Sequence, residues 1–571
     1  MNSFIFLSYF YFLLLSVLGY GFLFKKIFTH TNKFNPEVSY GYIGFYGLAF
    51  ITFISMLTNI FLAHNIVHNT ILHLSGLFFF FIFYKSTNIK YFKYIFFISL
   101  ILLPSLLISK SNEDFPYYHL PYTTYLTENK LIFGMGHLNH GYNLLSSLFN
   151  FNSTVKLPYI GLYSFHFIYV YFLIFFNFFI LNEVFNKNNK DILINTLFVL
   201  AFVFFNLSFN RIAEFGTDKA GHLLIVLITI KLLQFFKDTN KNQIYYNILP
   251  ILPLFVYVIS LKAYFSTYIL LLLPIFFYKQ NFLNLIKKII FTRIFYFCFF
   301  LITLMCTHYF FATGCLIAPI SFLCFGESFS WARSIESMNE LSIWLEQWSK
   351  AGAGPGFRAE NLTDYLKGIN WVPNWIDRYV FTKVTDQIGI LFISILLVFG
   401  FLFNFSKQKK YAFNKEIYIF YVAILLVFFI WFFKHPALRY GGYPVTFFIF
   451  SIPVVLFFEK FKIKNNFNRN TKVLLILVFL VLNIKNVSRI KNEFDRNDMY
   501  KFSNFPYYVI KKIEYKSSTS ESGLITYSPK YIENESNFCW DVPSPCIMDP
   551  KAIIISKKKS GYFFITGTIH D

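Results

Sequence analysis

Long apolar runs alternate with short polar connections along most of the chain, and this pattern predicts a series of membrane-spanning helices. The first run, residues 3–24, contains no charged side chain. A helix of that length crosses the roughly 30 Å hydrocarbon core of a bilayer. A window of about 19 residues locates about 14 such runs. They lie near residues 3–24, 40–62, 67–84, 91–109, 160–181, 192–209, 220–236, 245–260, 264–278, 289–312, 388–405, 417–433, 443–458 and 471–485.

Lysine and arginine are concentrated in alternate connections between these runs. By the positive-inside rule those connections face the cytoplasm. The others, including the long loops 110–159 and 313–387, are nearly balanced or acidic, so we expect them to face outward. An even number of spans then places both termini outside. The expected fold is an all-α transmembrane region over residues 1–485, followed by a small non-cytoplasmic α/β domain over residues 486–571.

Composition supports a membrane protein and argues against a nucleic-acid partner. The chain is 56% hydrophobic and only 14% charged, whereas charged residues make up about 25% of a typical soluble protein. The net charge of +22 would suit nucleic acid, but most of the basic residues lie between the apolar runs. There they orient the protein in the membrane, so we expect no binding of nucleic acid.

Four of the six cysteines fall in segments predicted to face outward. Cys315 and Cys324 share one loop, and Cys539 and Cys546 share the tail. Disulfides persist outside the cytoplasm, so we expect these residues to form two local pairs. Four unrelated free thiols are the alternative. A zinc site is disfavoured because neither pair has the two-residue spacing typical of zinc ligands.

An acidic pair, Glu113 and Asp114, opens the first long outward loop directly after a span. Partial desolvation there would raise the pKa of a carboxylate and suit it to act as a general base. Tyr117, Tyr118 and His119 follow, and aromatic rings and hydroxyl groups of this kind can bind a sugar. The alternative is a solvated helix cap, in which the acids complement a helix N-terminus.

A second polar segment on the same predicted face carries Glu214 and Asp218 at helical spacing, with Lys219 and His222 beside them. These residues can bind a polar substrate together with the first acidic pair. An ordinary polar turn is the alternative.

Two isolated cations are also predicted to emerge at this face. Lys262 stands alone in a very short connection between apolar runs, where it could bind a lipid phosphate or extend toward the headgroups. Arg439 precedes two glycines, and its planar guanidinium fits phosphate oxygens. A glycine turn with a structural arginine is the alternative. Acids for a base and cations for a phosphate are together what sugar transfer from a lipid phosphate requires.

The loop 313–387 contains several tryptophans, of which Trp344 and Trp348 recur at helical spacing. This spacing favours amphipathic helices that lie at the membrane interface. A platform for stacking sugars is the alternative.

The Glu113-Asp114 pair with its following aromatic residues resembles the acidic motif of the GT-C superfamily of membrane glycosyltransferases. The chain also resembles an uncharacterised family of bacterial multi-spanning proteins, which share the Asp-Phe-Pro-Tyr-Tyr-His-Leu-Pro stretch from Asp114, the Gly-Cys…Pro…Cys loop, the Pro…Arg-Tyr-Gly turn and a late Cys-Trp…Pro-Cys segment. This likeness implies a multi-pass protein of a bacterial inner membrane.

The GT-C resemblance implies transfer of a sugar, with inversion, from a polyprenyl-phosphate donor to a glycan or lipid acceptor of the cell envelope. Asp114 or Glu113 would take the proton of the acceptor hydroxyl, and Lys262 and Arg439 would hold the leaving phosphate. Glu214 and Asp218 would then form the second acidic site of that superfamily.

A transporter or polymerase of lipid-linked glycans is the alternative function. Only Lys231 stands out as a charged residue within a span, whereas an ion path normally needs more. No cofactor is required by the sequence. A divalent cation at the acidic pairs is compatible with it, although no spacing demands one.

Overall fold

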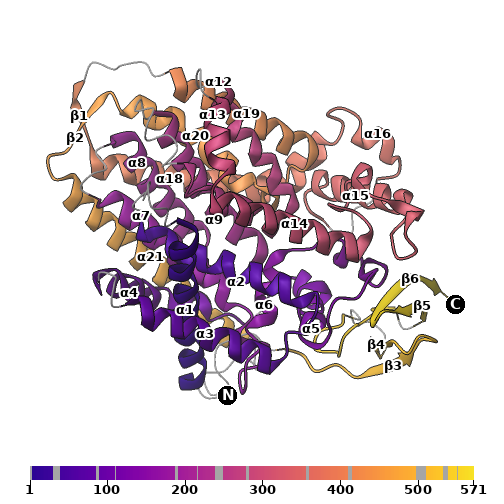
Figure 1. Ribbon diagram of the computed structural model, residues 1–571. Helices are drawn as coiled ribbons and strands as arrows, with labels where there is room; N and C mark the ends of the chain where they lie inside the picture. Colours follow the sequence, from indigo (N-terminus) through magenta and orange to yellow (C-terminus); the bar gives the residue numbers. More distant parts are fainter. Residues whose placement is uncertain are drawn as a thin grey trace.

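The structure is a computed structural model, and most of the chain is helical (Figure 1). It describes residues 3–29, 39–84, 89–109, 111–186, 191–214, 216–237, 248–277, 282–354, 359–408, 415–496, 510–530, 538–549 and 551–570.

Within these residues, nine helical segments are long and apolar enough to cross a membrane. Helix formation satisfies every backbone polar group inside the segment, which is what a lipid environment demands. The nine segments are formed by α1 (Ser3–Phe24), α2 (Ile43–Asn59), α3 (Ile66–Tyr84), α7 (Phe167–Val184), α9 (Gly216–Lys237), α14 (Arg293–Thr313), α18 (Thr385–Leu402), α19 (Lys415–Lys434) and α21 (Phe467–Arg496).

Shorter apolar helices account for the remaining predicted runs. They are α4 (Ile89–Leu106), α8 (Ile192–Ser208), α11 (Leu252–Leu261), the 3-10 helix η7 (Ala263–Leu272) with α12 (Leu273–Phe277), and α20 (Gly442–Phe458). Each predicted apolar run therefore coincides with a helix, although residues 245–247 of the run near 245–260 and residue 278 of the run near 264–278 lie outside the described residues.

Two predicted boundaries are wrong, since the run near 471–485 continues to Arg496 in α21 and the run near 388–405 begins earlier. The earlier start arises because α17 (Val372–Trp375) and the π-helix η10 (Ile376–Val384) continue directly into α18. The polar residues of η10 conceal this continuation in a window that scores hydrophobicity alone.

The central helices are α7, α8 and α9, whose side chains are buried almost throughout. Helices α3, α18, α19 and α21 expose many large apolar side chains, for example Phe78, Phe392 and Ile476. An apolar outer surface of this kind suits contact with lipid rather than water. Helices α1 and α3 approach closely where Gly19 faces Gly76, since a Cβ on Gly19 would meet the Gly76 carbonyl oxygen. Small residues at such crossings let helix backbones pack directly.

Connections predicted to be cytoplasmic contact one another at one end of the helices. There β1 (Phe403–Gln408) pairs antiparallel with β2 (Phe461–Ile463), at the upper left of Figure 1. At the same end, Lys237 forms ion pairs with Asp191 at 2.9 Å and Glu459 at 3.1 Å.

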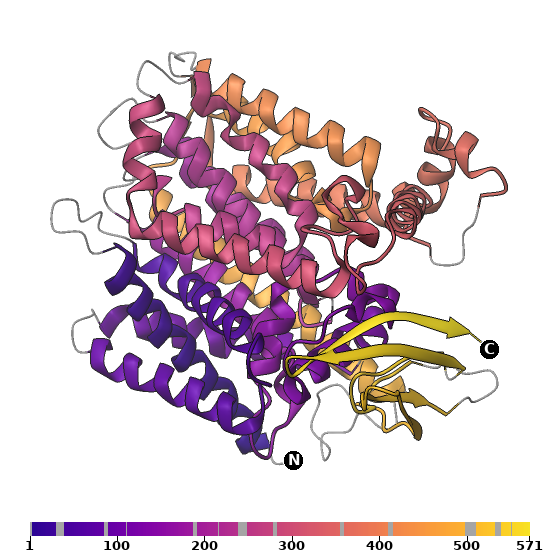
Figure 2. The ribbon, with the colours of Figure 1, turned by 45° about the vertical axis from the view of Figure 1, so that its right-hand side comes forward.

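The two long predicted outward loops and the tail meet at the other end, where the yellow strands and α15 project to the right in Figure 2. The backbone N–H of Phe133 donates to the Phe563 carbonyl at 2.9 Å, and the Ile565 N–H donates to the Phe133 carbonyl at 2.9 Å. The carboxylate of Glu128 accepts from the Ser544 N–H at 2.9 Å. His137 also contacts the Trp331 carbonyl at 3.1 Å. These contacts place the three segments on a common side, as the charge pattern predicts.

Short helices fill the two loops. The first loop contains η3 (Phe115–His119), α5 (Leu120–Glu128), η4 (Met135–His137), η5 (His140–Asn143) and α6 (Ser147–Thr154), and the second contains α15 (Ile335–Lys350) and α16 (Leu362–Leu366). Both predicted disulfides are formed, Cys315–Cys324 and Cys539–Cys546.

The tail differs from the expected α/β domain. Its described residues, 510–530, 538–549 and 551–570, form the hairpins β3 (Tyr515–Thr519)–β4 (Ile525–Pro529) and β5 (Ala552–Lys559)–β6 (Tyr562–His570), with no helix. Residues 486–496 instead extend α21, and within them Arg489 donates to the Pro104 carbonyl at 3.0 Å and the Leu107 carbonyl at 2.6 Å. These bonds satisfy carbonyls at the end of α4 that lack helical partners.

Candidate functional site

Four of the predicted charged residues form one connected cluster, although they are far apart in the sequence. The guanidinium of Arg439 donates from Nη2 to Asp114 Oδ2 at 2.8 Å and from Nε to Asp218 Oδ2 at 2.9 Å. Lys262 Nζ donates to the other Asp218 oxygen at 2.6 Å and contacts the Arg439 carbonyl at 3.4 Å. We call these residues, Asp114, Asp218, Lys262 and Arg439, the ion cluster.

The ends of three apolar helices position the ion cluster. Asp218 lies in the first turn of α9, Lys262 directly follows α11, and Arg439 lies in the 3-10 helix η11 (Leu438–Tyr440), between α19 and α20. Because these three charges lie where apolar helices begin or end, they reach the same level of the protein, and Asp114, directly before η3, meets them there.

Gly441 fixes the turn that carries Arg439. Its φ of 84° is a left-handed conformation, which favours glycine. A Cβ at this position would also approach the Tyr268 ring to 2.9 Å. The Tyr268 hydroxyl donates to the Gly441 carbonyl at 2.6 Å, and the Gly441 N–H donates to His222 Nε2 at 3.3 Å. His222 therefore supports the turn rather than joining the ion pairs.

Aromatic rings surround the two cations. Lys262 Nζ lies 4.2 Å from the centre of the Tyr440 ring, and the guanidinium carbon of Arg439 lies 5.4 Å from that of Trp348. Tyr264 and His435 pack around Tyr440 at 5.4 and 4.9 Å. Such cation–π contacts stabilise a charge by about 0.5–2 kcal/mol, depending on how far water is excluded.

Neither Trp348 nor Tyr440 is predicted from the sequence to be a site residue. The sequence favours an interfacial helix for Trp348, and its spacing with Trp344 shows only that the two share a face of α15. Its contact with Arg439 depends on how α15 packs, which spacing does not encode. Tyr440 directly follows Arg439 in the sequence, and this adjacency is the one sequence feature that could have indicated that Tyr440 belongs to the site.

The aromatic residues that follow Asp114 line the neighbouring segment. Tyr118 packs against His119, with ring centres 4.4 Å apart, and against Phe149 at 6.1 Å. His119 is buried, and its Nε2 has no hydrogen-bond partner among the described residues. Tyr117 accepts a hydrogen bond at its carbonyl from Asn139 at 3.0 Å. Tyr118 and His119 therefore extend the site inward from Asp114.

The disulfide-closed segment of the tail covers the other side of η3. The backbone N–H of Trp540 donates to the Pro116 carbonyl at 3.3 Å. The Trp540 ring packs on the Phe115 ring, with centres 6.2 Å apart. The Tyr117 ring lies 5.9 Å from that of Phe538. The tail thereby fixes the segment that presents Asp114.

Three other predicted residues lie outside the ion cluster. Glu214 pairs with Arg211 at 2.8 Å, three residues earlier, and its backbone carbonyl accepts from Asn112 at 3.2 Å. Lys219 packs over the Phe209 ring at 5.0 Å. Glu113 is exposed and forms none of the ion pairs found among the described residues. The two predicted acidic pairs thus contribute one carboxylate each to the cluster.

The electrostatics of Asp114 depend on Arg439. Burial alone would raise the pKa of this carboxyl, but the Arg439 guanidinium holds it below its usual range. The side chains of Asp114 and Arg439 are each 28% exposed, against 12% for Asp218. The Asp114–Arg439 half of the cluster is therefore the part that a ligand can reach.

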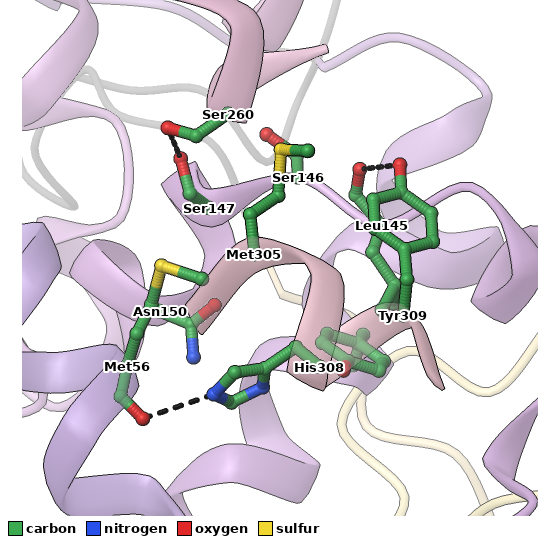
Figure 3. Close-up of a pocket in the computed structure, with 10 residues that line it drawn as sticks. Met56, Leu145, Ser146, Ser147, Asn150, Ser260, Met305, His308 and Tyr309 are labelled. Atoms are coloured by element: carbon green, nitrogen blue, oxygen red, sulfur yellow. Dashed lines mark hydrogen bonds between the residues drawn. The ribbon is translucent and has the colours of Figure 1, made fainter. Parts of the chain in front are cut away.

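A small pocket lies beyond Tyr118, one helical turn along the chain at Tyr122. Figure 3 shows its polar contacts: Ser147 and Ser260 share a hydrogen bond of 2.8 Å, and His308 Nε2 donates to the Met56 carbonyl at 2.9 Å. The amide nitrogen of Asn150 in its wall has no partner among the described residues. Polar walls of this kind suit a water molecule or a hydroxyl group. Ser260, in the wall of the pocket, precedes Lys262 of the ion cluster by two residues.

No group of three His, Cys, Asp or Glu side chains arranged to hold a metal ion occurs in the described part of the chain. Within the ion cluster, the two carboxylates are already neutralised by Arg439 and Lys262.

Comparison with known proteins gives one match. A family model described as "Domain of unknown function (DUF8201)" matches residues 3–447. No curated protein and no solved structure matches the chain. The matched region includes every residue of the ion cluster.

Proposed function

The chain belongs to the DUF8201 family, which is defined by a domain of unknown function, and we propose that it is a membrane glycosyltransferase of GT-C type. The proposal is drawn from the residues of the site itself. The donor is a polyprenyl-phosphate-linked sugar, and the acceptor is a hydroxyl group of a cell-envelope glycan or lipid. The observation that carries the proposal is the single guanidinium of Arg439 bound to two carboxylates, one of them partly exposed.

The proposed reaction needs opposite charges held close together. The Asp114 carboxylate takes the proton of the acceptor hydroxyl while that oxygen attacks the anomeric carbon from the face opposite the leaving group. The bond between the anomeric carbon and the phosphate oxygen breaks, and the phosphate leaves with the electron pair. Arg439 and Lys262 stabilise its negative charge. One displacement of this kind inverts the anomeric centre.

The ion pairs offer a way to couple donor binding to the activation of the base. While Arg439 binds Asp114, the low pKa of that carboxyl makes it a weak base. A donor phosphate that draws Arg439 toward itself removes this effect, and burial then raises the pKa of Asp114. The carboxylate therefore becomes a better base when the leaving group is in place.

The proposal includes a topology. All of the 14 or so apolar helices cross a bacterial inner membrane, both termini lie outside, and the ion cluster lies at the outer leaflet. The polyprenyl chain stays in lipid, and only its phosphate reaches Arg439 and Lys262. The joint contacts of the two long loops with the tail support this arrangement.

The test is transfer by purified protein from a polyprenyl-phosphate-sugar donor. We expect Asp114→Asn to lower kcat by about 10²- to 10⁴-fold, the usual contribution of a general base. Glu113→Gln, which changes the exposed neighbouring acid, is expected to retain activity and so decides between the two acids. Asp377→Asn changes another exposed acid and serves as the control. Wild-type rates in the Asp114→Asn protein would refute the assignment of the base.

A further inference from the structure

A second arginine on the same side of the protein lacks the partners that Arg439 has. Arg333 immediately precedes Ser334, the N-cap of α15. Its backbone N–H donates to the Thr313 carbonyl at 2.9 Å, which anchors it to the end of α14. Its side chain is half-buried, and its Nε is buried without a hydrogen-bond partner among the described residues. No ion pair to Arg333 occurs within the same described part of the chain.

Two histidines accompany this guanidinium. His137 and His140 both lie close enough for Arg333 to act on them electrostatically, and burial together with this cation lowers the pKa of each, that of His137 to about 4. Both rings are therefore neutral near pH 7. His137 Nε2 donates to the Trp331 carbonyl at 3.1 Å, whereas the buried His140 Nε2 has no partner in the described segments.

The surroundings contain little negative charge to neutralise Arg333. Glu340 is the carboxylate that acts on it electrostatically, and Glu340 is exposed and forms no ion pair with it among the described residues. A half-buried cation with unused donors is costly unless an anion completes the site. A guanidinium beside a neutral imidazole suits a tetrahedral oxyanion, because the planar fork and the ring nitrogen can donate to separate oxygens.

Helix α15 links this position to the ion cluster. The His140 ring packs on Trp344 with centres 4.7 Å apart, and Trp348, one turn later, packs on Arg439. One turn of helix advances about 5.4 Å. His140 and Arg439 therefore lie along one face of α15, at the end of the protein where the loops and tail gather.

From this arrangement we propose that Arg333 and His140 form a second anion site, which binds a phosphate group. The phosphate belongs either to a lipid headgroup or to a soluble phosphorylated molecule. This site is separate from the ion cluster, and it does not depend on sugar transfer.

The test is protection of Arg333 from phenylglyoxal, measured by mass spectrometry of the peptides from the intact protein in detergent and in nanodiscs. As the baseline, the protein is measured in a maltoside detergent, which contains no phosphate, and there we expect inorganic phosphate to slow modification of Arg333 by about tenfold, as a charge-assisted contact would. The exposed Arg469 should not be protected, and it is the internal control. Chloride at equal ionic strength controls for screening. His140→Ala should weaken the protection while leaving Arg469 unchanged.

Nanodiscs that contain phosphatidylglycerol distinguish the two sources of phosphate. Protection by this lipid without added phosphate assigns the site to a headgroup, whereas protection by inorganic phosphate alone assigns it to a soluble group. Equal modification of Arg333 under all of these conditions, or equal protection of Arg469, overturns the proposal. Because Arg439 is unchanged in every protein used and each arginine is measured separately, neither result depends on activity.

Discussion

Replacement of Arg439 by glutamine should change both the stability of the protein and how that stability responds to pH. The substitution removes the ion pairs to Asp114 and Asp218, at 2.8 and 2.9 Å. Asp218 keeps Lys262 at 2.6 Å, whereas Asp114 keeps no ion pair within the described residues. Removal of one partner of a buried pair costs about 3–5 kcal/mol. Because Arg439 and Asp114 are each 28% exposed, we expect the lower end, about 3 kcal/mol near pH 7.

The pH response follows from the pKa of Asp114. In the wild-type protein this pKa lies below that of the unfolded chain, so the ion pair contributes stability above about pH 4 and loses it as the pH falls through the folded pKa. Without Arg439, burial raises the folded pKa above the unfolded one. The variant then binds a proton more readily when folded, so its deficit relative to wild type should shrink between about pH 7 and pH 5.

The measurement is chemical denaturation of the purified proteins in detergent at about pH 7 and about pH 5, with unfolding monitored by tryptophan fluorescence. Arg469→Gln is the control, because this arginine is exposed. Adding Asp114→Asn to Arg439→Gln removes the isolated carboxylate and should recover about 1–2 kcal/mol near pH 7, a coupling typical of contacting residues. An equal deficit at both pH values, together with additive single changes, would refute the reasoning.

Three further predictions concern the surroundings of the cluster. Trp348→Ala should weaken donor binding by about 1 kcal/mol, seen as a higher KM for the polyprenyl-phosphate donor, while Trp348→Phe retains most of the effect. The double change Cys539→Ser with Cys546→Ser should reduce the stability of the tail by about 2–3 kcal/mol, seen as faster proteolysis under non-reducing conditions; an unchanged rate would contradict it. A cysteine introduced at the exposed Glu327 should react with an impermeant maleimide added outside cells, and one introduced at the exposed Lys462 should react only after lysis. The opposite labelling pattern would show that the protein has the opposite orientation in the membrane.

The helices were predictable because lipid imposes a strong local rule. A segment in hydrocarbon must satisfy its own backbone, so an apolar run of sufficient length becomes a helix. The predicted meeting of Asp114, Asp218, Lys262 and Arg439 rests on the same rule, since charges at helix ends on one side share one level of the bilayer. Their actual ion pairs depend on which helices are neighbours, and alternating hydrophobicity does not specify this.

The other differences have local causes. The spacing groups Glu214 with Asp218, but Arg211 lies three residues before Glu214 and pairs with it. Side chains at that spacing meet on a helical turn. The sequence predicts an α/β domain in the tail but not the position of each strand, and β3 shows why, because every one of its residues is exposed. Strands of that kind give little signal of period two.

The contact of Trp540 with η3 has a consequence for biosynthesis. Trp540 follows Asp114 only after most of the membrane-spanning helices, yet its backbone N–H binds the segment that presents Asp114. On the proposed topology, those helices must be inserted and the tail must be exported before this contact can form. Asp114 is therefore synthesised long before Trp540, so a chain still being inserted into the membrane would hold this carboxylate without the support that orients it.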